Sequence, residues 1–222
     1  MLDKKPCMQI TLTDTKPSIF ESKIGGLGYI PHDKNFPTDS NGNQLRLLAQ
    51  IECDKIQLDG FMKTGLLQFW ILNDEFGLDF NNPTNQDGFR IIYYPEIDKT
   101  VTESEINSKF VKSKYDDNAY CDFPVFRECS MNFEKSENMP DKHCKYNSGH
   151  KVGGYPYFTQ DDPRDEKQLE YYDFLLFQLD TDSIDGEYIT MWCDGGVGNF
   201  FINSEKLKKC DFSDILYNWD CF

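Results

Sequence analysis

The sequence has few basic residues and no long hydrophobic segment. Its 222 residues include 38 Asp and Glu but only 23 Lys and Arg, which gives a net charge of −15. Nucleic-acid binding depends on Lys and Arg that displace counterions from phosphates, so this composition argues against it. No stretch approaches the roughly 20 apolar residues of a membrane span, and the first residues form no apolar leader. We therefore expect a cytoplasmic protein that binds neither nucleic acid nor membrane.

The cysteines and histidines lack the spacing of familiar sites. Eight cysteines are an even number, but the chain is long enough to fold without a disulfide framework, so we expect reduced, mostly buried thiols. Cys121, Cys129, His143, Cys144 and His150 lie close in sequence, yet none has the C-x2-4-C spacing of a structural zinc site. A cysteine nucleophile, Cys193 or Cys144 with His150, has no supporting signature, and there is no G-x-S-x-G elbow. No cofactor is predicted.

Two parts of the chain share an ordered pattern. Three segments of the first part align with three of the second, the first two at an offset of 128 and the third at 131. The aligned segments are 23–30 with 151–158, 47–54 with 175–182, and 65–71 with 196–202. Two copies are too few for a solenoid, whose repeats run to roughly 20 to 50 residues. We interpret the pattern as a duplication within one pseudo-twofold domain.

The strand and turn signals predict one α+β domain, residues 1–222, with mainly antiparallel β-sheet and few short helices. Its parts are quasi-repeat one (about 8–94), an irregular insertion (about 112–149), quasi-repeat two (about 150–203) and an aromatic C-terminal tail (212–222). Residues 8–12 alternate weakly and are predicted to form an edge strand. Thr102 and Glu105 have the spacing of a capping box, which predicts a helix over 103–110.

Acidic pairs are the candidate metal ligands. Glu52 and Asp54 align with Asp180 and Asp182, and a spacing of two at the end of a strand places each pair on one face. Carboxylates so placed could hold a divalent cation, and 180–187 loosely resembles a calcium loop without its twelfth-position glutamate. The alternative is that these acids are solvated and cap turns. Both interpretations stay open.

Aromatic and polar residues of the second copy are the candidate ligand-binding residues. His150, Tyr155, Gln178 and Trp192 could line a groove for a peptide or sugar, because rings offer a large rigid contact area. In a β-rich protein the same rings are also typical core residues. The G-G-x-G strings at 25–28 and 195–198 precede strands rather than helices, so they predict turns with positive φ and not a phosphate cradle.

Several of these strings resemble one known family. The strings are HKVGGYP at 150–156, QDDPR at 160–164, LLFQLDTD at 175–182, WCDGGVGNFFI at 192–202 and the closing DFS at 211–213. In this order they resemble the YwqG-like family, and the first copy adds Gly25, Gly26, Phe36 and Gly42. Proline is common in that family where this chain has Gly28, and tryptophan where it has Phe36. The family is a domain of unknown function, so the resemblance implies a fold and no chemistry.

The leading functional hypothesis is a non-enzymatic binding protein whose acidic surface engages a protein partner, for instance a basic toxin that it neutralises as an immunity protein. It follows from the charge of −15 and from the lack of an assembled catalytic constellation. The alternative is a small-molecule or divalent-metal-dependent enzyme. Its site would lie at the interface of the repeats and use Asp180, Asp182 and His150.

Overall fold

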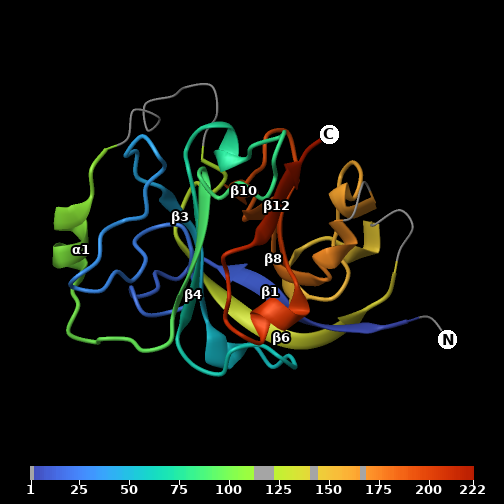
Figure 1. Cartoon of the computed structure of the whole chain (residues 1–222), viewed down its shortest axis with the longest axis horizontal. Coiled ribbons are helices and arrows are strands. Elements are labelled where there is room, and N and C mark those ends of the chain that lie inside the picture. The colour runs from blue at the N-terminus through green and yellow to red at the C-terminus, as the bar shows by residue number, and fades with distance from the viewer. Residues whose placement is uncertain (1–2, 113–122, 141–144, 166–168) are drawn as a thin grey trace.

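Within the residues that the computed structural model describes, 3–112, 123–140, 145–165 and 169–222, ten strands form one antiparallel sheet. These strands are β1 (Lys5–Thr13), β2 (Lys23–Ile24), β3 (Arg46–Glu52), β4 (Leu66–Ile71), β5 (Phe89–Tyr94), β6 (Cys129–Asn138), β7 (His150–Gly153), β8 (Phe174–Asp180), β11 (Val197–Ile202) and β12 (Ile215–Asp220). Their order is β12-β11-β8-β7-β1-β6-β2-β3-β4-β5. The sheet curls like half a barrel, so that β4 and β8 face each other above β1 and β6 (Figure 1).

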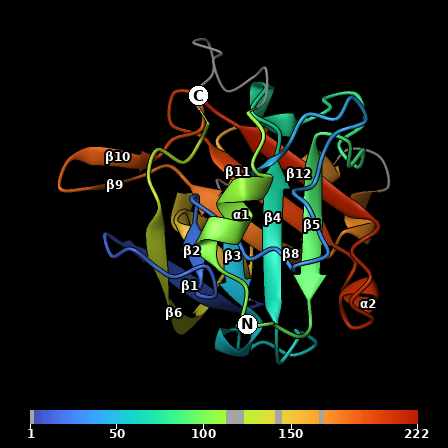
Figure 2. The same ribbon diagram turned by 90° about the vertical axis from the view of Figure 1, so that its left-hand side faces the viewer.

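Few helices accompany the sheet. They are α1 (Glu103–Lys109) and α2 (Ser204–Leu207), and a small ribbon pairs β9 (Asp182–Ile184) with β10 (Glu187–Thr190). Five single turns of 3-10 helix lie at Cys53–Lys55, Glu75–Gly77, Lys145–Asn147, Pro163–Asp165 and Leu169–Tyr171. The Thr102 side chain accepts the N–H of Glu105 at 3.2 Å, so α1 begins where the capping spacing predicted. Figures 1 and 2 place α1 outside β3 and β4.

Two predictions for the strands at the centre of the sheet were wrong. β1, predicted as an edge strand, pairs with β6 on one side and β7 on the other. The segment 112–149, predicted as an irregular insertion, contains β6, which pairs with β1 from Ser130 to Asn138. Every side chain of β6 beyond Met131 is exposed or half-buried, and since neighbouring residues of a strand point to opposite faces, this part of β6 meets solvent on both faces. A strand with so little apolar character resembles a loop in sequence.

The core lies inside the curl. Every residue of β4 and β11 is buried, and aromatic rings from the two sides meet there. The ring of Phe69 lies 4.7 Å from that of Phe177 and 5.2 Å from that of Phe200, centroid to centroid. Phe200 in turn stacks on Tyr217 of β12 at 4.4 Å. The core therefore joins strands that are distant in sequence, and the aromatic C-terminal segment is part of it.

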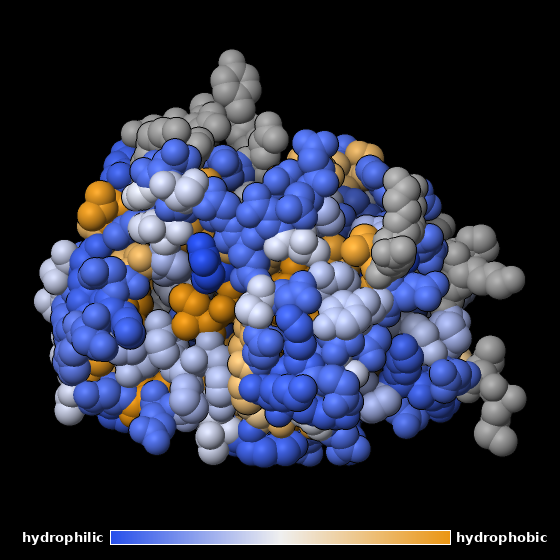
Figure 3. All heavy atoms as spheres, viewed as in Figure 1, coloured by the Kyte–Doolittle hydropathy of each residue, from blue (hydrophilic) through white to orange (hydrophobic). Residues whose placement is uncertain are grey.

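Two further apolar clusters cover the outer faces of the sheet. One lies under α1 and includes Trp70 and Ile106. The other lies under the segment that precedes β8 and includes Phe158 and Phe201. The space-filling view shows mostly hydrophilic residues, with hydrophobic ones in small separate areas (Figure 3). No helix of the described residues is long and apolar enough to cross a membrane.

Buried glutamines tie loops to both sides of the sheet. The side chain of Gln50 on β3 accepts a backbone N–H and donates to two carbonyls, and Gln178 on β8 does the same. The partners of Gln50 are Tyr29, Ile19 and Glu21; those of Gln178 are Tyr157, Asn147 and Gly149. Each neighbouring glycine pair, 25–26 and 153–154, has positive φ, between 61° and 76°. The turn at 25–26 is one that the glycine strings predicted, and in the other string, 195–198, Gly195 has a φ of 116°.

Candidate functional site

The acidic pair of the second copy lies beside His150. Asp180 is 8% exposed, and its carboxylate accepts the N–H of Gly149 at 2.6 Å. Burial raises the pKa of Asp180 above its usual value. His150 Nδ1 accepts the Asp180 N–H at 3.0 Å, so its Nε2 carries the proton and donates to Asp182 at 3.1 Å. This hydrogen bond lowers the pKa of Asp182. His150, Asp180 and Asp182 are thus brought together as a hydrogen-bonded network.

The acidic pair of the first copy is arranged differently. The carboxylate of Glu52 accepts the N–H and the hydroxyl of Ser22, both at 3.0 Å. Asp54 is exposed in the turn Cys53–Lys55. Among the described residues, Cys193, Asp194 and Cys221 form the one group of three or more side chains whose ligand atoms converge as a metal site requires. Neither acidic pair belongs to it.

The four predicted ligand-binding residues do not line a common pocket. Gln178 and Trp192 are fully buried, and the Gln178 amide bonds to the backbone groups of Tyr157, Asn147 and Gly149. The indole of Trp192 packs in the core, 5.4 Å from the ring of Phe76. His150 is 3% exposed, whereas the Tyr155 hydroxyl donates to the carbonyl of Asp3 near the start of the chain. Gln178 and Trp192 thus form part of the scaffold, as their burial requires.

The sequence cluster considered for zinc falls partly outside the structure. Cys121, His143 and Cys144 lie outside the described residues. Cys129 is buried on β6, next to β2. His150 is engaged by Asp180 and Asp182. The described part of this cluster therefore brings no pair of ligands together.

A pocket of about 530 Å³ opens beside β2 and β3, and we call it the Arg46 pocket. It lies between the glycine turn at 25–26, the segment 123–128 and the end of α1. Its apolar lining residues include Phe36, Leu45, Phe110, Phe123, Val125 and Phe126. Its charged residues are Arg46, Lys112, Arg127 and Glu128. Concave sites of this size with apolar walls and a few polar groups are typical of small-molecule binding.

The two arginines hold positive charge at this pocket. Arg46, the first residue of β3, lies over the ring of Phe123, with 4.5 Å from its guanidinium carbon to the ring centroid. No carboxylate of the described residues forms an ion pair with it. Arg127 Nη1 lies 3.5 Å from Asp14 and 3.9 Å from Glu187, both exposed carboxylates, and such pairs are weak. Its Nε has no partner within the described chain.

Glu128 is neutralised from beneath the pocket. The ammonium of Lys23, whose side chain is 1% exposed, lies 2.7 Å from the Glu128 carboxylate and donates to the carbonyl of Leu27 at 2.9 Å. Burial lowers the pKa of Lys23, and Glu128 partly offsets this effect. A Cβ on Gly26 would lie 2.2 Å from Glu128 Oε1, so the glycine at this position leaves the space that the carboxylate occupies. Because Lys23 neutralises Glu128, the two arginines make the charge of the pocket positive.

Sequence reasoning missed this pocket. Arg46 and Arg127 stand 81 positions apart in no recognisable motif, and β2, β3 and β6 bring them together only by long-range pairing. The nearest signal was the glycine string at 25–28, which was interpreted as a turn. The turn is there, and it also forms one wall of the pocket.

Comparison with known proteins places the chain in a family. A search of curated proteins found no match. A family model described as a domain of unknown function, DUF1963, matches residues 22–221, which is almost the whole chain. The matched region contains both glycine turns, both buried glutamines and the Arg46 pocket. The chain therefore belongs to the DUF1963 family of domains of unknown function.

Proposed function

We propose that this protein is a binding protein and that its ligand is a small organic anion held in the Arg46 pocket. The observation that carries the proposal is the pair of arginines set among aromatic walls in a protein of net charge −15. A guanidinium presents donors in a fork that matches carboxylate, sulfonate or phosphate oxygens. Phe110 and Phe126 keep their rings partly exposed at the pocket, where an apolar ligand body would cover them.

The net negative charge of the protein restricts which anions the positively charged pocket can bind. A surface of net negative charge repels anions at long range, and this repulsion is screened within about 8 Å at physiological ionic strength. At shorter range the Arg46 guanidinium, which has no ion pair among the described carboxylates, supplies the attraction. The ligand we propose therefore combines one acidic group with an aromatic or aliphatic body, rather than several charges.

The aromatic sulfonate 8-anilinonaphthalene-1-sulfonate is a suitable probe. We expect it to bind with enhanced fluorescence, and Arg46→Gln to raise its Kd about tenfold or more, since a hydrogen bond to a charged group contributes about 1.5–3 kcal/mol. Arg90→Gln is the matched control, because Arg90 is half-buried like Arg46 yet lies outside this pocket.

Two results would contradict this proposal. One is equal binding of the probe by the Arg46→Gln and Arg90→Gln variants. The other is equally tight binding of N-phenyl-1-naphthylamine, which has the same aromatic body without the sulfonate. Either would mean that charge at Arg46 has no part in recognition.

A second candidate function is binding of a basic protein partner by the acidic surface, as an immunity protein neutralises a toxin. The net charge of −15 favours it, because complementary charge steers association and weakens with salt. The test is affinity capture from native lysate at low and at high salt. A stoichiometric basic protein retained only at low salt supports this function, and its absence contradicts it.

The enzyme alternative rests on the hydrogen-bonded network of His150, Asp180 and Asp182. With a divalent cation on the two carboxylates, this network would form a small metal-dependent site. We expect magnesium or calcium to raise the melting temperature if that is its role. No shift with either ion would leave His150 and its acids as structural groups.

We also propose that the domain is YwqG-like and built from quasi-repeats 8–94 and 150–203. The strand order supports a duplication, because β2-β3-β4-β5 and β7-β8-β11-β12 run outward in the same sequence from the central β1–β6 pair. The buried glutamines, 128 residues apart, support it as well. A cytoplasmic location is consistent with free thiols at all six cysteines that the structure describes.

A further inference from the structure

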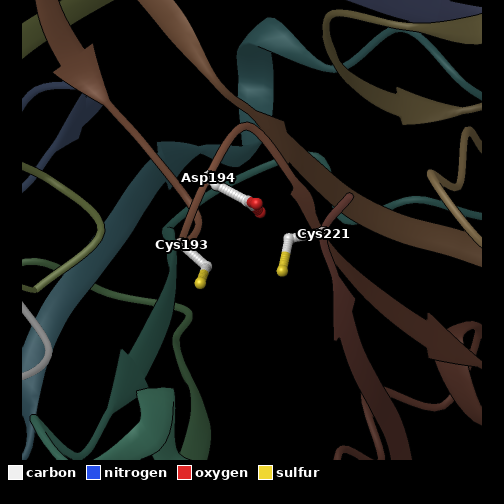
Figure 4. Close-up of side chains that lie close together, drawn as sticks. All are labelled: Cys193, Asp194 and Cys221. Atoms are coloured by element: carbon white, nitrogen blue, oxygen red, sulfur yellow. The ribbon is translucent and has the colours of Figure 1, made fainter.

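Cys193, Asp194 and Cys221 bring three potential metal ligands together on the side of the molecule built by the second copy (Figure 4). Cys193 and Asp194 lie in the turn between β10 and β11, and Cys221 follows β12. The two sulfur atoms and a carboxylate oxygen all lie within 4.8 Å of one another. In tetrahedral zinc sites with bonds of about 2.3 Å, two thiolates stand about 3.8 Å apart. The ligands therefore need to approach by about 1 Å at most to bind one ion.

Backbone hydrogen bonds hold the turn that carries two of these ligands. The N–H groups of Gly195 and Gly196 donate to the carbonyl of Trp192 at 3.2 and 2.8 Å. The indole of Trp192 is fully buried, so the turn is anchored in the core. Between these anchors Cys193 has a φ of 52°, in the left-handed region that few residues other than glycine adopt. The backbone of Cys193, from which its thiol extends, is thus set by the fold around it.

The third ligand is fixed to the same place by strand pairing. Val197 of β11 pairs with Asp220 of β12, directly before Cys221. A Cβ on Gly196 would lie 1.8 Å from the carbonyl oxygen of Asp220, so only glycine lets the turn approach the end of β12 this closely. Cys193 and Cys221 are 28 positions apart in sequence and are neighbours for this reason.

The ligand types select the metal. Two of the three are thiols, which prefer soft or borderline ions such as zinc, whereas calcium and magnesium take oxygen ligands. Cys193 and Asp194 are exposed and Cys221 is half-buried, so water can fill a fourth position. Three protein ligands with one open position are typical of zinc sites that exchange ligands. From this geometry we propose that Cys193, Asp194 and Cys221 bind one zinc ion, with both thiols losing their protons to solvent.

The test is zinc binding by the reduced full-length chain, measured by competition with a chromophoric chelator. A background with C121S and C144S removes the thiols that lie outside the described residues. In that background we expect one zinc per chain, and C193S or C221S should weaken binding at least about 100-fold, because even outer-shell partners of a metal contribute about 10–100-fold. C210S is the matched control, since Cys210 is also an exposed thiol with positive φ, 53°.

A spectroscopic readout separates a metal site from general loss of structure. Cadmium should give a thiolate charge-transfer absorption that C193S and C221S remove and C210S keeps, while calcium and magnesium fail to compete. Zinc binding that is absent, or equally weakened by C210S, would overturn the proposal. So would a reduced protein that takes up no zinc while the unreduced protein is two hydrogens lighter, because that result indicates a Cys193–Cys221 disulfide. Failure here leaves probe binding at the Arg46 pocket unaffected, so the two proposals are tested separately.

Discussion

On both sides of the sheet, a side chain accepts the backbone N–H of the acidic residue that ends a strand, but the accepting side chains differ. We call β2 to β5 the first half, and β7, β8, β11 and β12 the second half. In the first half, Ser22 Oγ accepts the N–H of Glu52 at 2.8 Å. In the second half, His150 Nδ1 accepts the N–H of Asp180 at 3.0 Å. The imidazole has a second nitrogen that reaches Asp182, so only the second half extends the bond into a network.

Both halves also bury a lysine. Lys23 and Lys151 each lie next to a glycine turn, and both are 1% exposed. The ammonium of Lys23 pairs with the carboxylate of Glu128 and donates to the carbonyl of Leu27, and the ammonium of Lys151 donates to the carbonyl of Asn147. The comparison teaches that the two halves share glycine turns, buried glutamines and buried lysines, and that the groups bonded to Glu52 and Asp180 differ.

The largest effects are expected at the shared glutamines. Gln50→Leu and Gln178→Leu each leave two buried carbonyls without their donor, and an unsatisfied buried group costs about 1–3 kcal/mol. We expect each variant to lower the free energy of unfolding by about 3–5 kcal/mol in urea denaturation, with Gln50→Leu the worse because Gln50 also holds Gln68. Gln57→Leu, at an exposed position, is the control. A Gln178→Leu variant with nearly the native free energy of unfolding would show that the two glutamines are not equivalent.

The buried lysine of the first half should be energetically coupled to its carboxylate. Lys23→Met leaves the Glu128 carboxylate unpaired, and we expect it to lower the free energy of unfolding by about 2–3 kcal/mol. In the double variant Lys23→Met, Glu128→Gln, we expect part of the loss to be recovered, which a double-mutant cycle of unfolding free energies measures. A double variant no more stable than Lys23→Met would contradict this coupling.

The glycine turns should lose stability in parallel. Gly26→Ala and Gly154→Ala place a Cβ 2.2 Å from Glu128 Oε1 and 2.5 Å from Asn138 Oδ1, at positive φ in both cases. Gly42→Ala also has positive φ but meets nothing within 4 Å, so it measures the backbone strain alone, about 1–2 kcal/mol. We expect each crowded variant to unfold at a lower urea concentration than Gly42→Ala. If all three midpoints coincide, the close contacts carry no cost.

The smallest effect is the pH dependence of stability that Asp180 and Asp182 contribute in the second half. Burial raises the pKa of Asp180 in the folded protein, so its stabilising contribution is complete below the unfolded pKa of about 3.9 and is lost as pH rises through the raised value. The hydrogen bond from His150 lowers the pKa of Asp182, so its contribution is present above about pH 3.9 and is lost as pH falls through the lowered value.

Unfolding free energies across this range test both signs. Relative to the native protein, Asp180→Asn should gain stability as pH rises, and Asp182→Asn should lose it. Opposite slopes are the expected outcome because the two side chains differ in burial and in partner. Parallel slopes for the two variants would show that His150 does not distinguish between its neighbours.

Features encoded over a few residues were predictable from the sequence. The start of α1 at Thr102 depends on a hydrogen bond to a residue three positions away, and the glycine turn at 25–26 depends on its own backbone. The predominance of antiparallel strands followed from local alternation and turn signals. In each case the interaction that decides the structure lies within the window that a pattern covers.

Features created by long-range pairing were not predictable. β6 is polar in sequence because most of its length is solvated on both faces, and only its partner β1 reveals it as a strand. Trp192 was a candidate both for a groove and for the core, and its indole lies in the core beside Phe76. Arg46 meets Arg127, and Cys193 meets Cys221, only after the sheet has formed. No local spacing could indicate either site.

The position of β1 also bears on how the chain is made. Lys5 pairs with Asn138, so the first strand waits for 133 further residues before its partner exists. At a synthesis rate of about 5–20 residues per second, this delay lasts roughly 7–27 s. During that time both edges of β1 are without β6 and β7, and its buried face, with Met8 and Ile10, is exposed. Folding of this domain on the ribosome is therefore a late event, and the nascent N-terminal strand is the segment that most needs protection from misassociation.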